Sequence, residues 1–134
     1  MAKPLILVLK EKIMTKKLFE GKSDIEMLGE INLNDNTKDF DYIEITLKIS
    51  DNEKTIKINN PSGKTFWEEL PYTLSDYYAK AFSRFLIKDN KIISIADNCG
   101  YYTINYLNSQ VNMHLDRTNY IRIKEVIGGK YYSE

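Results

Sequence analysis

The residues best suited to acid-base or anion chemistry lie near the C-terminal end of the chain, around its only histidine, His114. An imidazole changes charge near neutral pH, so it can give or take a proton where few other side chains do. Side chains two positions apart on a strand share a face, which places Asp116 beside His114, and Arg122 and Lys124 on the polar face of the next expected strand. Such a face could bind an anion or act as an acid-base centre. An exposed polar sheet face explains the same pattern, and we favour this second interpretation.

Two other chemical motifs are incomplete. Gly63-Lys64-Thr65 imitates the end of a phosphate-binding loop, but the first glycine of that pattern would fall at position 58, which is Ile58. The single cysteine, Cys99, cannot form an intramolecular disulfide, and no base that would activate it is evident nearby. One histidine and one cysteine also give too few ligands for the usual metal sites, so we expect neither a metal nor a cofactor.

Charge is uneven along the chain although the formal net charge is zero. Residues 1–22 carry a net charge of +4, residues 23–53 carry −7, and the remainder carries +3. An acidic band can attract a basic partner, whereas a solvated acidic face is the ordinary alternative. The candidate contact residues in this band are Asp35, Asp39, Asp41, Tyr42 and Glu44.

Tyrosine is abundant, with ten in 134 residues. Its side chain offers a large area and a hydroxyl group at a small entropic cost, which suits recognition surfaces. Several exposed tyrosines would therefore favour a binding function.

The elements that must position these residues are predicted from hydrophobic periodicity. A period of two predicts strands at Leu5–Met14 and Ile25–Leu33, and a hairpin of Tyr42–Ile49 with Thr55–Asn59. Four more strands follow from the same period, and their short turns predict an antiparallel meander. Their expected ranges are Lys91–Ala96, Tyr101–Leu107, Val111–Leu115 and Asn119–Val126, with Val111, Met113, Leu115, Ile121 and Ile123 facing the core.

A different period runs from Leu74 to Leu86, where apolar residues recur at intervals of three and four. Thr73 with Asp76 resembles a helix start, and Asp89-Asn90 a helix stop. A short helical turn around Phe66, Trp67 and Leu70, ended by Pro71, is expected just before it. The sequence therefore predicts an α+β fold in which an antiparallel sheet of about seven to eight strands packs on one central amphipathic helix.

The length of 134 residues is typical of one domain, so we expect a single α+β domain over residues 1–134 with a flexible tail at 128–134. The early apolar run Leu5–Leu9 is too short for a secretory signal and is followed at once by charged residues. We expect no membrane span and a cytoplasmic location.

Three functional classes remain, of which we favour a non-enzymatic module that binds another, basic protein. A small inhibitor or immunity-type protein of a bacterium or phage, of the anti-defence type, fits this profile, and a homo-oligomer stays open. The second class is a small-ligand or anion-binding protein, or an enzyme, that uses the His114, Arg122 and Lys124 face. Nucleic-acid binding is third, because zero net charge and three arginines give few phosphate contacts.

Overall fold

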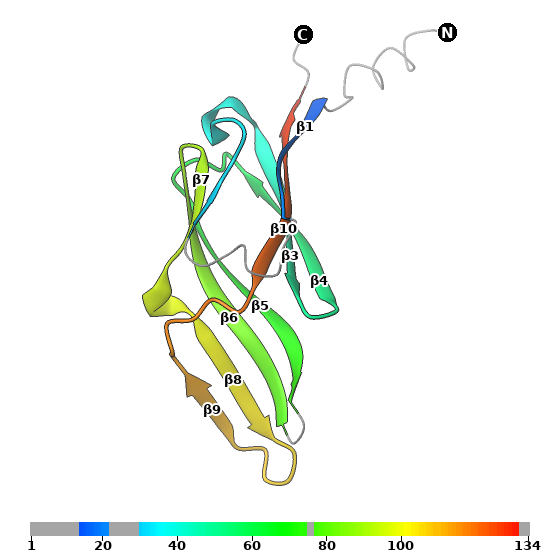
Figure 1. Ribbon diagram of the computed structural model, residues 1–134, viewed down its shortest axis with the longest axis vertical. Coiled ribbons are helices and arrows are strands. Elements are labelled where there is room, and N and C mark those ends of the chain that lie inside the picture. The colour runs from blue at the N-terminus through cyan, green and yellow to red at the C-terminus, as the bar shows by residue number, and fades with distance from the viewer. Residues whose placement is uncertain (1–13, 22–29, 75–76, 132–134) are drawn as a thin grey trace, which may run out of the picture.

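The computed structural model describes residues 14–21, 30–74 and 77–131, which form two antiparallel sheets (Figure 1). The longest helices in this part of the chain are two short 3₁₀ turns, η1 (Thr37–Asp39) and η2 (Ala96–Asn98). The strands are β1 (Met14–Glu20), β2 (Glu30–Asn32), β3 (Tyr42–Ile49), β4 (Asn52–Asn59), β5 (Thr65–Leu74), β6 (Tyr77–Lys88), β7 (Lys91–Ser94), β8 (Gly100–Asn105), β9 (Val111–His114) and β10 (Arg122–Lys130).

The first sheet has four strands in the order β1-β10-β3-β4, so β10, the last of the described strands, lies in its interior. The second sheet has six strands and is organised by the long strand β6. One edge of β6 pairs with β5 from Thr65 to Leu74. The other edge pairs first with β8 and then with β7, and the path continues to β9 at one end and β2 at the other.

The predicted α+β class is wrong, because the expected central helix is replaced by strands. Leu74 ends β5, and Tyr77–Lys88 form β6, which has partners on both edges. Alternate residues of β6 from Ala79 to Ile87 are buried, and Ala81, Phe85 and Ile87 belong to the core cluster shared with the other sheet. Phe82 lies on the opposite face and is buried too, because Trp67 and Tyr102 pack on its ring with centroids 4.9 Å away in each case.

Burial on both faces of β6 explains why its apolar spacing predicted a helix. A strand that is covered on both sides has apolar residues at odd and even positions, and such a run contains spacings of three and four without being a helix. Aromatic residues, which are common in this segment, favour strands.

The short helix predicted around Phe66, Trp67 and Leu70 is also wrong, since all three residues lie in β5. Pro71 does not end this strand. Among the described strands, β5 pairs only with β6, and an edge strand tolerates proline because it needs no donor on its outer side.

The hairpin predicted at Tyr42–Ile49 is confirmed, with β3 and β4 joined by a turn at Ser50 and Asp51. Its alternation predicted the core face correctly, because Ile43, Ile45 and Leu47 are fully buried. They join one hydrophobic cluster that both sheets share, with residues such as Phe85 and Ile87 contributed by the six-stranded sheet.

The C-terminal meander forms only in part. β8 and β9 pair as expected, but β7 and β8 both pair with β6, and β10 crosses to the other sheet, where it lies between β1 and β3. Val111 and Met113 of β9 were expected in the core and are instead more than half exposed, as is Leu115 just beyond the strand.

The glycine pair Gly128-Gly129, predicted to open a flexible tail, lies inside β10 and pairs with β1 and β3. Both glycines are buried, and a Cβ on either would overlap an aromatic ring, that of Phe40 at Gly128 and that of Tyr42 at Gly129. Small residues are needed here because the rings fold over the backbone.

Some predictions lie mainly outside the described residues. These are the first strand up to residue 13, the segment 22–29 of the second strand, and residues 132–134 of the tail.

Candidate functional site

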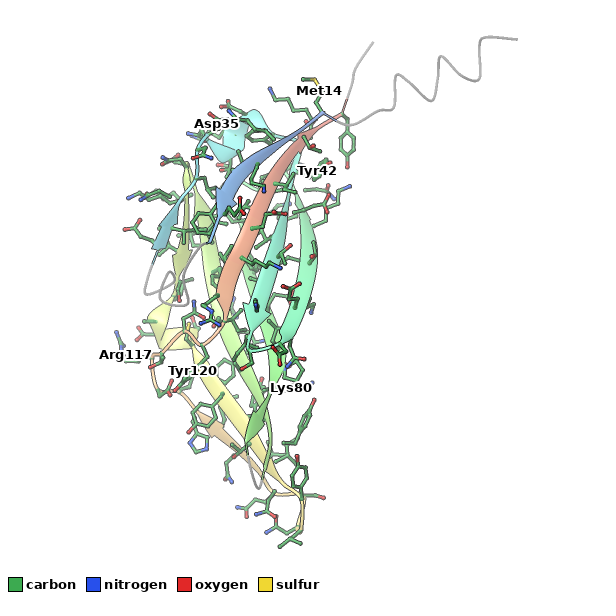
Figure 2. All side chains as sticks on the ribbon, turned by 45° about the vertical axis from the view of Figure 1, so that its right-hand side comes forward. Met14, Asp35, Tyr42, Lys80, Arg117 and Tyr120 are labelled. Carbon is green, nitrogen blue, oxygen red and sulfur yellow. The ribbon has the colours of Figure 1, made fainter. Side chains whose placement is uncertain are left out.

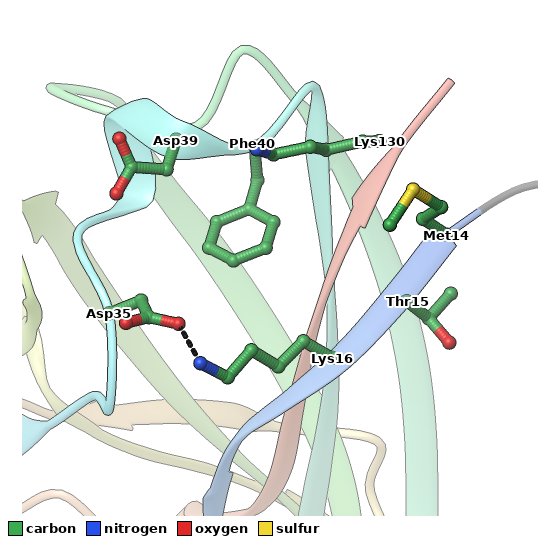
Figure 3. A pocket seen from close by; sticks show the side chains of 7 residues that line it. All are labelled: Met14, Thr15, Lys16, Asp35, Asp39, Phe40 and Lys130. Atoms are coloured by element: carbon green, nitrogen blue, oxygen red, sulfur yellow. Dashed lines mark ion pairs between the residues drawn. The ribbon is translucent and has the colours of Figure 1, made fainter. Parts of the chain in front are cut away.

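The acidic residues Asp35 and Asp39 line a hollow of about 280 Å³ at one end of the molecule (Figures 2 and 3). Its other lining residues are Met14, Thr15, Lys16, Phe40 and Lys130. Asp35 forms an ion pair with Lys16, and Lys130 lies with its Nζ 5.9 Å from the centre of the Phe40 ring. Two carboxylates and two ammonium groups therefore share this hollow, and it is not a purely acidic site.

The neighbouring candidates Asp41 and Tyr42 hold the end of β10 in place. The Tyr131 backbone N–H donates to Asp41 Oδ2 at 2.7 Å, and the rings of Tyr42 and Tyr131 lie 5.2 Å apart. Lys57 donates to the Tyr131 hydroxyl at 2.6 Å and lies over the Tyr42 ring. Burial raises the pKa of Tyr42, which is only 1% exposed and so offers almost no surface to a partner.

Lysines from distant segments also lie against other acidic residues of the band. Glu30 pairs with Lys91 at 3.0 Å, Glu53 pairs with Lys124 at 2.5 Å, and Glu44 lies opposite Lys57 in the β3–β4 ladder. The hydrogen bond from Lys124 lowers the pKa of Glu53 and raises that of Lys124. In the described part of the chain, the acidic band is thus interleaved with lysines.

The second set of candidates, His114, Arg122 and Lys124, is divided between the two sheets. His114 belongs to β9, which pairs with β8, whereas Arg122 and Lys124 belong to β10. The His114 ring stacks on Tyr101 with centroids 4.5 Å apart. The polar face expected from pairing of β9 with β10 is not formed, because these strands do not pair.

Asp116, the residue proposed to assist His114, bonds instead to the Tyr120 hydroxyl. This hydrogen bond and burial raise the pKa of Tyr120 to about 12. Tyr120 also meets the edge of the Tyr101 ring at 5.7 Å. Asp116 is thus bonded to the aromatic cluster that Tyr120, Tyr101 and His114 form.

The incomplete motifs have structural roles. Lys64 donates to the Asn59 backbone oxygen at 2.5 Å, and Gly63 adopts the positive φ of the turn between β4 and β5. Cys99 is buried, and its thiol donates to the Ile95 carbonyl oxygen at 3.2 Å. Within the described ranges, no three histidine, cysteine or acidic side chains gather as a metal site would require, and no helix there has the length and apolar character needed to cross a membrane.

The surface that sequence reasoning missed is an apolar tip at the far end of the six-stranded sheet, around the β8–β9 hairpin (Figure 1). Leu107 is 97% exposed and Tyr106 is 64% exposed at the turn of this hairpin. We define the apolar tip by its exposed large side chains, which are Tyr78, Tyr106, Leu107, Val111, Met113 and Leu115. Residues 98–115 contain no Asp, Glu, Lys or Arg in a chain with 28% charged residues, and this is the sequence signal that could have found it.

A second hollow of about 280 Å³ adjoins the apolar tip. Strand register builds it, because Tyr78 lies opposite Ile104, Ile104 opposite Val111, and Lys80 opposite Tyr102. We call it the tip hollow; its lining residues are Glu69, Tyr78, Lys80, Tyr102, Ile104 and Val111.

One carboxylate is fixed at the wall of the tip hollow. The Tyr102 hydroxyl donates to Glu69 Oε1 at 2.7 Å, and the Trp67 indole N–H donates to the same oxygen at 3.4 Å. Burial, followed by the hydrogen bond to Glu69, raises the pKa of Tyr102 to about 12. The hollow therefore combines apolar walls with an oriented carboxylate and the Lys80 ammonium, a combination that can hold an apolar side chain and one polar group.

Models of known protein families give no match to the chain, and a comparison with curated proteins gives none either.

Proposed function

We propose that the chain is a non-enzymatic protein-binding module that contacts its partner through the apolar tip and the tip hollow. The observation that carries this proposal is the exposure of six large apolar side chains at the β8–β9 turn, along β9 and at the neighbouring end of β6. Contiguous exposed apolar surface is uncommon on proteins that act alone and often marks an interaction site.

The chemistry of the surface suits a protein partner. Tyrosine, methionine and other large apolar residues are typical of the centre of protein interfaces, where charged residues are depleted. The tip hollow offers space for one anchoring side chain, and Glu69 and Lys80 supply polar contacts beside it. Binding energy in interfaces is commonly concentrated in a few such anchors.

This mode of binding replaces the acidic band as the main recognition surface. Asp35, Glu30 and Glu53 each have a lysine partner within the chain, so fewer free carboxylates are left for a basic partner. The role that fits a small binding module of this kind is that of an inhibitor or immunity-type protein of a bacterium or phage, acting in the cytoplasm.

The experiment is affinity capture from a lysate of the host cell with the wild-type chain and with the double variant Tyr106→Ser/Leu107→Ser. Both side chains are exposed at a turn, so the variant keeps the fold while it removes apolar contact area. We expect a protein that the wild type retains and the variant loses, with an affinity for the purified protein reduced at least about tenfold.

The matched control is Asp39→Lys, an exposed change in the hollow at the opposite end of the molecule. It should retain the same protein as the wild type. Equal capture by the wild type and the Tyr106→Ser/Leu107→Ser variant, or loss of capture with Asp39→Lys alone, would show that the apolar tip is not the binding surface.

A further inference from the structure

The outer edge of β9 is open. In the six-stranded sheet β9 is the terminal strand beyond β8, and among the described residues no strand pairs with its other side (Figure 1). An open edge carries a row of backbone donors and acceptors that can pair with another strand.

The other edge strands in the described part of the chain carry the usual protection against such pairing, which is charge or proline. The protecting residues are Lys16, Lys17 and Glu20 in β1, Glu30 in β2, Glu53, Lys54 and Lys57 in β4, and Glu68, Glu69 and Pro71 in β5. β9 has the sequence Val-Asn-Met-His, which contains no Asp, Glu, Lys, Arg or Pro. The edge is thus chemically suited to accept a strand.

The register of the hairpin determines which backbone groups point outward. The Asn105 N–H donates to the Gln110 carbonyl oxygen at 3.0 Å, so these two residues form a hydrogen-bonded pair. Such pairs alternate along an antiparallel ladder, so the pair of Thr103 with Asn112 also bonds across the hairpin. Val111 and Met113 therefore direct their N–H and C=O groups to the open edge.

We propose that β9 pairs with β9 of a second copy of this chain, antiparallel about a two-fold axis at Met113. In this register Met113 lies opposite Met113 of the second copy, and Val111 lies opposite Leu115. On the other face Asn112 lies opposite His114. The proposal goes beyond the proposed function and needs no other protein, although Val111, Met113 and Leu115 also belong to the apolar tip.

The sequence of this edge is complementary to itself in that register. Apolar residues meet apolar residues on one face, and on the opposite face the Asn112 amide meets the His114 imidazole. Asp116, the first charged residue after the strand, lies opposite Gln110, so no two like charges meet. A two-fold interface requires this kind of self-complementarity, because each contact occurs twice.

The pairing joins two six-stranded sheets edge to edge and leaves the tip hollow open on the sheet face. Only one short strand per copy takes part, so the interface is at the small end of the range for specific contacts. We therefore expect a Kd in the micromolar range.

The test is analytical ultracentrifugation of the purified full chain from about 1 to about 100 µM, a range that brackets such a Kd. The wild type should approach twice the monomer mass of 15.7 kDa as concentration rises. Val111→Lys should weaken the dimer at least about tenfold, because the lysine displaces an apolar contact. The double variant Val111→Lys/Leu115→Glu should restore it, because each lysine then lies opposite a glutamate of the second copy.

Asn59→Lys is the matched control, since it adds the same charge to an exposed position of the edge strand β4. It should leave the dimer unchanged. A wild type that stays monomeric over the whole range overturns the proposal, and so does a dimer that Val111→Lys leaves intact or that the second substitution fails to restore.

Cysteine cross-linking gives a second measurement that locates the axis. Met113→Cys should form a disulfide-linked dimer under mild oxidation, because directly opposed strand residues lie within disulfide range. Asn59→Cys should not, and the native Cys99 is buried. Equal cross-linking of the Met113→Cys and Asn59→Cys variants would contradict the β9 pairing.

Discussion

Tyr102 illustrates how a single residue links the fold to the candidate site. Its ring packs on Phe82, and its hydroxyl donates to Glu69 at the wall of the tip hollow. Burial and this hydrogen bond both favour the protonated phenol, which is why its pKa rises to about 12 from an ordinary value of 10.0.

The raised pKa predicts a pH dependence of stability. Between pH 10.0 and about 12 the unfolded tyrosine loses its proton while the folded one keeps it. The unfolded state then binds fewer protons, so the free energy of unfolding falls as pH rises through this window. The stabilisation that results from the raised pKa of Tyr102 is present in full below the pKa of the unfolded tyrosine.

Tyr102→Phe should therefore reduce the slope of stability against pH in this window, measured by chemical denaturation at several alkaline pH values. Tyr120→Phe is a useful comparison, because the pKa of Tyr120 is also raised to about 12 and its loss should reduce the slope in the same direction. An unchanged slope in both variants would mean that neither phenol differs between folded and unfolded states.

At the scale of single residues, sequence reasoning failed where partners lie far apart in the chain. Tyr102 and Glu69 are 33 residues apart, and Lys124 and Glu53 are 71 apart. No local pattern connects such pairs, because strand order alone brings them together. The predicted His114, Arg122 and Lys124 face failed for this reason.

At the scale of elements, secondary-structure predictions succeeded where one face of a strand is exposed to solvent. β3 alternates between buried isoleucine or leucine and partly exposed residues, so its period of two was unambiguous. β6 is covered on both faces around Phe82, so apolar residues occur there at both odd and even positions. Their spacing resembles that of a helix.

The two sheets are also joined at their edges by polar contacts between β4 and β5. Asn52 donates from its side chain to the Pro71 carbonyl oxygen at 2.6 Å, and Lys54 pairs with Glu68 at 2.9 Å. These are contacts between different sheets, because β4 belongs to the first and β5 to the second.

Asn52→Ala should lower the free energy of unfolding by about 1 kcal/mol. The substitution removes a partly buried hydrogen bond and leaves the Pro71 carbonyl oxygen without this donor. Lys54→Gln should cost less, about 0 to 1 kcal/mol, because the lysine is half exposed and water screens the pair. Urea denaturation of the two variants beside the wild type measures the difference. A larger loss for Lys54→Gln than for Asn52→Ala would reverse this ranking.

At the scale of the whole molecule, stability and binding are located at different places. The shared core lies between the two sheets, whereas the apolar tip extends from the end of one sheet. Substitutions can therefore separate the two properties.

Ile45→Ala should cost about 2 to 5 kcal/mol, because it leaves a cavity in the fully buried core. Leu107→Ala should change stability by less than about 0.5 kcal/mol, because the side chain is almost wholly exposed. Thermal or chemical unfolding of both variants checks this, and a comparable loss for Leu107→Ala would mean that the tip supports the core.

The interior position of β10 has a consequence for synthesis. A ribosome delivers the chain from its N-terminus, so β3 and β4 emerge long before residues 122–130, which must lie between β1 and β3. The first sheet can close only after residues 122–130 have been synthesised, and until then the edge of β3 that pairs with β10 stays unpaired. A premature stop before Arg122 would remove the strand that joins β1 to β3, and the truncated product could not assemble this sheet.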